Sequence, residues 1–193
     1  MKKYYYLFFY ILLLNSCEKK EFKTLKEHLN TSVKFEKKQV IDGKLDFTIS
    51  IPKNYNFKIR ENLSENIILS LDITSTKFEN DQQCLISIQK KKGHKQNISL
   101  KDEFKHCIYI VRDFFNVEVL ESGISNALKY ESYFLHTKPN TKKFGKSEFM
   151  MFLIESDEKN IFYEISINSP LEKNLESNMA KLVQCLKSFK KTS

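Results

Sequence analysis

The side chains that could carry chemistry are few and widely spaced along the chain. None of the four histidines is spaced with another, or with a carboxylate, as a zinc motif requires; they are His28, His94, His106 and His136. His106 and Cys107 are adjacent, and adjacent side chains on a helix point about 100° apart, so they would not readily share a metal. We therefore predict no metal and no cofactor. A Cys–His dyad assembled in space, as a hydrolase would need, stays open as an alternative.

The four glycines exclude two common kinds of active-site motif. Gly43, Gly93, Gly123 and Gly145 stand far apart, and each is predicted to lie in a turn. A phosphate-binding loop and a Gly-x-Ser-x-Gly nucleophile elbow both need glycines close together. The sequence therefore carries no recognisable motif for phosphate chemistry or for acyl transfer.

Cys17 is the cysteine whose neighbours dictate its chemistry. A cationic start at Met1-Lys2-Lys3, an apolar run over 4–14 and a small residue before Cys17 are the three parts of a secretory signal. The run is about half of the roughly 20 residues that span a bilayer as a helix. Leu14-Asn15-Ser16-Cys17 resembles the lipobox of bacterial lipoproteins. The resemblance implies that residues 1–16 are a signal peptide and that Cys17 is lipidated; an uncleaved signal anchor is the alternative.

The residues after Cys17 bear on location. Acyl chains on one cysteine would anchor the mature protein in a membrane. Glu18-Lys19-Lys20-Glu21 loosely resembles the charged runs that send some lipoproteins outward, and we expect the outer membrane. The same four charges are also typical of a solvated tether. We predict a polar tether over residues 17–31, in which a loose helical turn around Phe22, Leu25 and Leu29 stays open.

Charge does not indicate a nucleic-acid partner. The net charge of +8 falls to +6 when Lys2 and Lys3 leave with the signal. Of the 32 cationic residues only Arg60 and Arg112 are arginines, whose bidentate fork reads bases and phosphates. We therefore predict no nucleic-acid binding.

Three cysteines remain after lipidation. Cys84, Cys107 and Cys185 are an odd number and cannot all pair within the chain. Cys107 and Cys185 fall on the apolar sides of predicted helices, and an oxidising compartment permits a disulfide between them. The alternative is that both are buried thiols.

The elements that position these residues are strands and two main helices. Period-two alternation predicts strands, and the spacing of apolar residues predicts a helix from Ser99 to Phe115 and another that begins at N-cap Ser169 with Pro170 in its first turn. The predicted strands cover 45–51, 55–59, 67–74, 84–89, 117–120, 127–136, 149–155 and 161–168.

This order predicts one α+β domain over residues 32–193, an antiparallel β-sheet packed against two main helices as a sandwich, with both helices on the apolar face. Three features of the chain resemble the PsbP-like superfamily. They are a strand that ends in Ile51-Pro52, a Gly-led strand from Gly123 to Lys129, and a last helix that closes in Leu186 to Phe189. That superfamily includes the DcrB-like bacterial lipoproteins. The chain lacks the tryptophan that is common after the first strand in relatives.

Two surfaces are candidate contact sites. Lysines in two predicted loops could meet an anionic surface, or could be ordinary solvated loop tips; they are Lys90, Lys91, Lys92, Lys95, Lys142, Lys143 and Lys146. Polar residues alternate with the core residues of several strands, which predicts a sheet face left open for a partner; its members are Thr48, Ser50, Ser70, Asp72, Thr74 and Ser166.

These observations favour a non-enzymatic, membrane-anchored envelope lipoprotein that binds or scaffolds another envelope protein. The alternative is a carrier of a small apolar ligand or lipid, which an apolar cavity of a few hundred Å³ would favour. A hydrolase is the least favoured function, because it needs a nucleophile and a base within hydrogen-bond reach.

Overall fold

The computed structural model describes residues 22–77, 83–141, 145–171 and 174–192. The signal segment 1–16, the lipidation site Cys17, and Lys142 and Lys143 lie outside the described residues. The strands are β1 (Lys37–Val40), β2 (Phe47–Pro52), β3 (Tyr55–Glu61), β4 (Ile67–Ser75), β5 (Leu85–Lys92), β6 (Val119–Ser125), β7 (Ser132–Thr137), β8 (Asn140–Thr141), β9 (Gly145–Glu155), β10 (Ile161–Pro170) and β11 (Lys190–Lys191). The helices are α2 (Leu25–Asn30), α3 (Leu100–Tyr109), its π-helical continuation η1 (Ile110–Phe114) and α4 (Leu175–Leu186).

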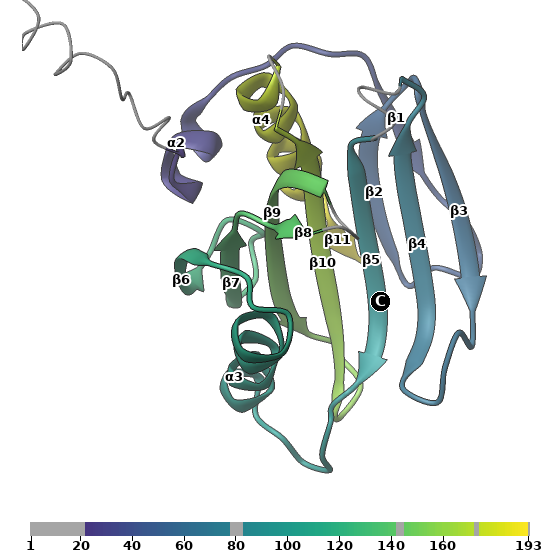
Figure 1. Cartoon of the computed structure of the whole chain (residues 1–193). Coiled ribbons are helices and arrows are strands. Elements are labelled where there is room, and N and C mark those ends of the chain that lie inside the picture. Colours follow the sequence, from purple (N-terminus) through teal and green to yellow (C-terminus); the bar gives the residue numbers. More distant parts are fainter. Residues whose placement is uncertain (1–21, 78–82, 142–144, 172–173, 193) are drawn as a thin grey trace, which may run out of the picture.

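A large antiparallel sheet organises the domain. Its strands follow the order β3-β4-β5-β10-β9-β7-β6, and β8 pairs with β9 at one end (Figure 1). A second, small sheet has the order β1-β2-β11. The predicted antiparallel sheet, and the α+β class that it implies, are confirmed.

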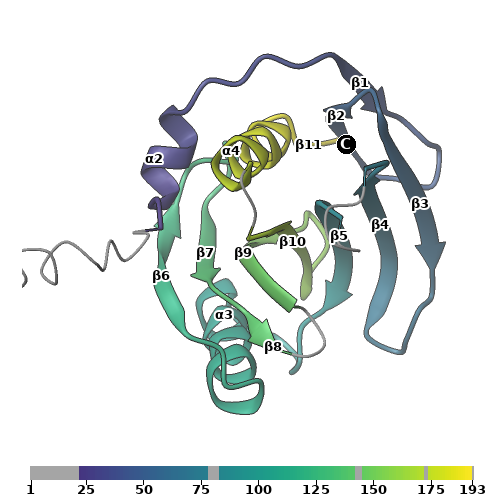
Figure 2. The same ribbon diagram turned by 45° about the horizontal axis from the view of Figure 1, so that its top comes forward.

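The large sheet curves around α4, which lies on its concave side together with β2 (Figure 2). Alternation along the strands gives this face its core: Ile165 and Ile167 of β10 are fully buried against Leu182 and Met179 of α4. Phe47 of β2 packs on Phe189 at 5.3 Å between ring centroids. The main core is therefore the layer between the large sheet, α4 and the small sheet.

The other face of the sheet carries α3. Met151 and Leu153 alternate with the concave-face residues of β9, and they pack with Phe104 of α3 in a second, smaller core. The prediction that both helices share one apolar face is wrong. Strands β9 and β10 carry apolar residues on both faces, so the sheet is covered by α4 on one face and by α3 on the other. The domain has three layers, with α3 outside the curved sheet.

Residues 22–31 are part of the domain rather than a tether. Thr24 and Glu27 form a capping box that begins α2, with the Glu27 amide donating to Thr24 Oγ1 over 3.3 Å. Phe22 packs against the main core, and Leu25 is 4% exposed within it. The predicted polar tether over 17–31 is therefore wrong from Phe22 onward, and the predicted domain start at residue 32 is too late.

The last helix begins later than its sequence motif indicates. Ser169 and Pro170 continue β10 and pair with Glu148 and Ser147 of β9, so the chain is extended where a helix start was predicted. The N-cap of α4 is Asn174. Pairing along a long hairpin outweighs a local capping motif here, and Pro170 is tolerated because it stands at the end of its strand.

Candidate ligand-binding pocket

An apolar pocket of about 320 Å³ lies between η1 and the outer face of the sheet. One wall comes from the helix side and the other from strands β5 and β9. The apolar side chains that line it include Ile110, Val111, Phe115, Leu85, Phe149 and Met151. A pocket of this size stands at the lower end of the range of about 300–1,000 Å³ that small-molecule sites occupy.

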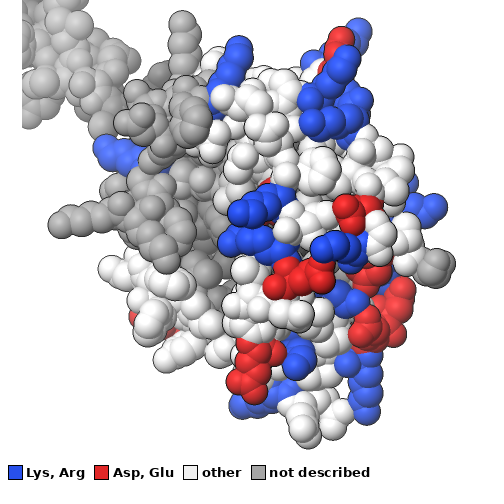
Figure 3. Space-filling view, turned by 90° about the vertical axis from the view of Figure 1, so that its right-hand side faces the viewer, with Lys and Arg blue, Asp and Glu red and all other residues white. Residues whose placement is uncertain are grey.

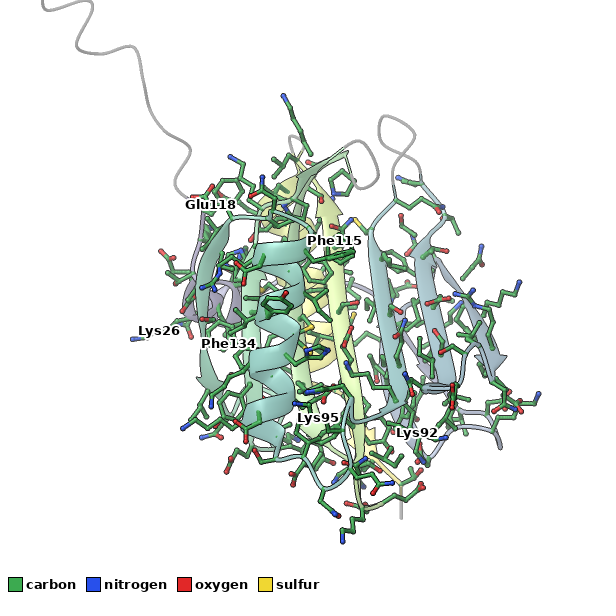
Figure 4. The ribbon with its side chains drawn as sticks, turned by 60° about the horizontal axis from the view of Figure 1, so that its bottom comes forward. Lys26, Lys92, Lys95, Phe115, Glu118 and Phe134 are labelled. Carbon is green, nitrogen blue, oxygen red and sulfur yellow. The ribbon has the colours of Figure 1, made fainter. Side chains whose placement is uncertain are left out.

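The π-helical turn η1 shapes this pocket. α3 begins at Ser99, whose hydroxyl accepts from the Asp102 amide at 3.1 Å. After Tyr109 the helix widens, and the Phe115 amide donates to the Ile110 carbonyl five residues back at 3.0 Å. π-Helical turns are rare in proteins, and those that do occur are often found at functional sites. Figure 4 shows Phe115 at the opposite end of this helix from Lys95.

Thr137 supplies an unpartnered polar group to the pocket. Its side chain is fully buried, and its Oγ1 has no hydrogen-bond partner in the described part of the chain. Thr137 pairs with Phe149, and Phe149 pairs with Asn168, so the three side chains share one row of the sheet on the same face. All three line the pocket. A buried hydroxyl without a partner carries a free-energy cost, which a bound ligand can remove.

A buried ion pair lies at the other end of the pocket. Lys91 Nζ is 2.6 Å from Glu164 Oε2 and 3.4 Å from Glu103 Oε1. Burial alone would lower the pKa of Lys91, but the carboxylate of Glu164 and the other nearby negative groups outweigh it and raise that pKa. The ammonium is therefore held charged between two carboxylates.

Cys107 lies beside this ion pair, with its Sγ 3.7 Å from Lys91 Nζ. Burial raises the pKa of the Cys107 thiol to about 12, against a smaller opposing effect of Lys91. A thiol in that state is protonated at neutral pH and is a poor nucleophile. The disulfide to Cys185 that the sequence permits is absent, and both cysteines are buried free thiols, as the alternative expected. Cys107 lies in the outer core, and Cys185 lies in the main core across the sheet.

Glu103 joins the ion pair to two histidines at the rim of the helix. His94 donates its backbone N–H to Glu103 Oε2 at 3.0 Å, and its Nδ1 lies 2.6 Å from the same oxygen. Burial would raise the pKa of Glu103, but the bonds from His94 and the charge of Lys91 hold it below its usual value. The His94 and His106 rings stack with their centroids 3.8 Å apart. Burial is the main cause that lowers the pKa of His106, and the charge of the neighbouring His94 lowers it further.

A second buried polar cluster ties α2 to the sheet. Glu148 Oε1 lies 2.8 Å from His28 Nε2 and 2.9 Å from His136 Nε2, and all three residues are 1% exposed. His136 Nδ1 is 4.0 Å from Glu121, which also accepts the Leu25 amide at 3.0 Å. Burial favours the neutral carboxyl, but the hydrogen bonds from His136 and His28 lower the pKa of Glu148.

These contacts bear on catalysis and on metals. His28 and His136 bond to Glu148, and His94 bonds to Glu103, rather than to a serine or cysteine nucleophile. Within the described ranges, no group of three or more His, Cys, Asp or Glu side chains is arranged to hold a metal ion. No helix of the described part of the chain is long and apolar enough to cross a membrane.

The lysines of the predicted anionic-surface site differ in their surroundings. Lys90 and Lys91 lie in β5 rather than in a loop, and Lys90 is paired with Asp46 at 2.6 Å and with Glu158. Lys92, Lys95 and Lys146 are exposed. Because neighbouring carboxylates compensate their charges, Lys90 and Lys91 are unsuited to bind an anionic surface. The sequence placed them in a loop because the apolar alternation of the strand stops before them.

The predicted open sheet face is split between two sheets. Ser70, Asp72 and Thr74 of β4 share the outer face with Ser166 of β10, beside the part that α3 covers. Ser70 is fully buried and donates to Asp72 at 3.2 Å, and Asp72 also pairs with Arg60. The prediction is wrong for Thr48 and Ser50, because β2 belongs to the small sheet, and for Ser70, because its side chain is fully buried rather than open to a partner. Figure 3 shows basic and acidic side chains intermingled on the side of the molecule where β3 lies.

Of the residues that line the pocket, the sequence singled out only Lys91 and Cys107, and for other roles. Thr137 lies just after the predicted strand 127–136, and Glu164 lies within the predicted strand 161–168. One signal was present: Glu164 and Asn168 are polar residues on one face of a strongly alternating strand, four positions apart.

Comparison with known proteins shows the fold. No family model matches the chain, and no curated protein sequence matches it. The Ran-binding protein Mog1p of Saccharomyces cerevisiae is similar with a TM-score of 0.56 and 12% identity, over 83% of this chain and 97% of that one. The cyanobacterial PsbP of Synechocystis has a TM-score of 0.55 at 10% identity, over 80% and 92% of the two chains.

LpqN of Mycobacterium tuberculosis, which is involved in cell envelope biogenesis, is similar with a TM-score of 0.53 and 9% identity, over 82% of this chain and 91% of that one. Likeness at such low identity extends to the fold and not to the activity. The predicted PsbP-like fold is confirmed.

Proposed function

We propose that this protein is a lipid-anchored, non-enzymatic binding module of the cell envelope that holds a small apolar ligand in the pocket beneath η1. The pocket is the observation that carries this proposal: it is apolar, it has a volume of about 320 Å³, and it contains a buried hydroxyl that has no partner among the described residues. Largely pre-formed apolar pockets with a few polar groups are the usual form of small-molecule sites.

The local chemistry supports binding rather than catalysis. The thiol nearest to the pocket, Cys107, has its pKa raised to about 12 by burial and lies beside a lysine that is already paired. The buried histidines are bonded to Glu148, away from the pocket lining. A hydrolase needs an activated nucleophile next to a base at the place where the substrate sits.

The length of the anchor limits what such a module can do. Phe22 already packs on the domain, so only four residues lie between it and the proposed lipid on Cys17. The five steps of backbone from Cys17 to Phe22 span at most about 18 Å. A domain held so close to its membrane suits the capture or presentation of a ligand at that surface, whereas carriage across the envelope would need a longer tether. We keep the outer membrane as the proposed location.

A second candidate function is the binding of another envelope protein at the half of the outer sheet face that α3 leaves uncovered. Edge strand β3 favours it, because one side of this strand is unpaired within the described sheet. An extended segment of a partner could add to such an edge. Disruption of β3 pairing by Lys58→Pro would abolish this binding but leave the pocket unaffected.

Titration with N-phenyl-1-naphthylamine, an uncharged probe that fluoresces in apolar surroundings, tests the leading proposal. We expect saturable binding to the full-length protein at about one probe per chain, and loss of binding in Val111→Trp, which fills the pocket. Ile124→Trp is the matched control, because Ile124 is 63% exposed on β6, away from the pocket lining. Absence of saturable binding to the unmodified protein, or equal binding by Val111→Trp, contradicts the proposal.

A further inference from the structure

The charges at the pocket determine which polar head a ligand can carry. Lys91 is the only cation among the described residues that line the pocket. Its ammonium is already shared by Glu164 at 2.6 Å and Glu103 at 3.4 Å. An anionic head at this end would meet two carboxylates around one lysine, so it would be repelled rather than bound.

The other end of the pocket offers uncharged hydrogen-bonding groups. Thr137 Oγ1 is buried without a partner in the described part of the structure, and the amide of Asn168 lines the same pocket. Asn168 and Glu164 are four residues apart on β10, which corresponds to about 13 Å along a strand. The ion pair and the unpartnered hydroxyl therefore lie at opposite ends, with the apolar walls of Met151, Phe149 and Val111 between them.

We infer that the ligand is an uncharged amphiphile, with one alkyl or acyl chain and a hydroxyl, ester or amide group that bonds to Thr137, and that the pocket rejects free carboxylates. The inference rests on the proposed function, since it assigns the ligand class of the same pocket. A hydroxyl such as that of Thr137 can donate to an ester carbonyl or accept from an alcohol. A buried polar group that is satisfied only by the right ligand gives strong discrimination.

Displacement of N-phenyl-1-naphthylamine by two ligands of equal chain length tests the inference. The ligands are laurate and 1-monolauroylglycerol, at pH 8 and below their micelle concentrations, with the full-length protein. We expect the glycerol ester to bind at least about tenfold more tightly than laurate, a ratio typical of one strong polar interaction. Equal binding, or tighter binding of laurate, overturns the inference. Failure of the probe itself to bind removes the proposed function as well.

Two variants test the two ends separately. Glu164→Gln removes the closest carboxylate from Lys91, so laurate should bind about tenfold more tightly while the glycerol ester changes less than about twofold. Glu131→Gln is the control, because it makes the same change of net charge at an exposed residue. An unchanged affinity for laurate in Glu164→Gln contradicts the assigned role of the ion pair.

Thr137→Val removes the unpartnered hydroxyl and keeps the shape of the side chain. We expect the glycerol ester to lose about fivefold or more in affinity. Thr74→Val, at a half-buried threonine of β4 outside the pocket lining, is the matched control. The circular dichroism spectrum and the midpoint of urea unfolding show that each variant is folded. Full affinity for the ester in Thr137→Val overturns the assignment of this hydroxyl.

Discussion

His28 Nε2 and Glu148 Oε1 lie 2.8 Å apart in the protein interior, although 120 positions separate the two residues in the sequence. The same oxygen is 2.9 Å from His136 Nε2. One carboxylate thus joins α2 to strands β7 and β9 of the large sheet. This contact therefore fixes α2 on the large sheet.

Glu148→Gln should weaken that attachment. The amide keeps the shape of the side chain but removes the charge that two histidines share, and hydrogen bonds to a charged group contribute about 2 kcal/mol each. We expect the free energy of unfolding in urea to fall by about that amount. Limited proteolysis should also cut sooner within residues 22–31. Exposed Glu131→Gln is the control, and equal stability of the two variants would mean that Leu25 and Phe22 hold α2 without the carboxylate.

The same carboxylate gives a pH dependence of stability. The pKa of Glu148 is lowered in the folded state, because the hydrogen bonds from His136 and His28 outweigh the opposite effect of burial. The unfolded chain therefore binds this proton first, at an ordinary glutamate pKa of about 4.3. The stabilisation is present above that pH and is lost as pH falls through the folded pKa.

Urea unfolding between pH 7 and pH 3 measures this effect. The difference in unfolding free energy between the unmodified protein and Glu148→Gln should shrink as the pH falls below about 4.3. The stability of Glu148→Gln should itself still fall with pH, but less steeply, because the pKa of Glu103 is also lowered in the folded state. A difference that stays constant down to pH 3 would contradict the assignment of this stabilisation to the charge of Glu148.

Gly93 is required for the close approach of the β5–α3 connection to the end of β10. A Cβ at this position would lie 2.6 Å from Ile98 Cγ2 and 3.0 Å from both Asn160 Oδ1 and Phe162 Cε2. Gly93→Ala should therefore lower the unfolding free energy by about 1–3 kcal/mol. Gly43→Ala is the matched control, since nothing lies within 4 Å of its Cβ, and its effect should stay within about 0.5 kcal/mol. Equal effects would contradict this account of the connection.

Cys17→Ser tests the anchor independently of the pocket. If Cys17 is the lipidated residue, the variant should either leave the membrane fraction or accumulate as the unprocessed precursor, because a hydroxyl cannot carry the thioether-linked lipid. Probe binding by the purified variant should be unchanged, since Phe22 onward forms the domain. Normal processing with unchanged membrane association would refute the lipoprotein proposal while leaving the ligand proposal intact.

Local sequence patterns predicted most of the strands. The alternation in β4 and in the β9–β10 hairpin places side chains on two faces whatever the rest of the chain does. The start of α4 was missed because the local capping motif at Ser169 competes with the non-local pairing of Ser169 with Glu148. β1 and β11 are too short, with four and two residues, to show a period.

The pocket could not be predicted because its parts meet only in three dimensions. Lys91 and Glu164 come from strands that are 73 residues apart, and Cys107 reaches them from α3. The absence of a partner for Thr137 depends on every neighbour of its hydroxyl, which no local pattern encodes. His28 and His136 stand far apart in the sequence, and their common partner Glu148 was visible only in the fold.

The most direct test of the ligand-binding proposal uses the fact that the chain has no tryptophan. Phe115→Trp places a single reporter at the pocket, and Phe57→Trp places one on β3; both positions are 43% exposed. On titration with 1-monolauroylglycerol below its micelle concentration, we predict a saturable blue shift of emission for Phe115→Trp and none for Phe57→Trp. Equal shifts in the two variants, or no shift in either, would contradict the proposal that the pocket beneath η1 is the binding site.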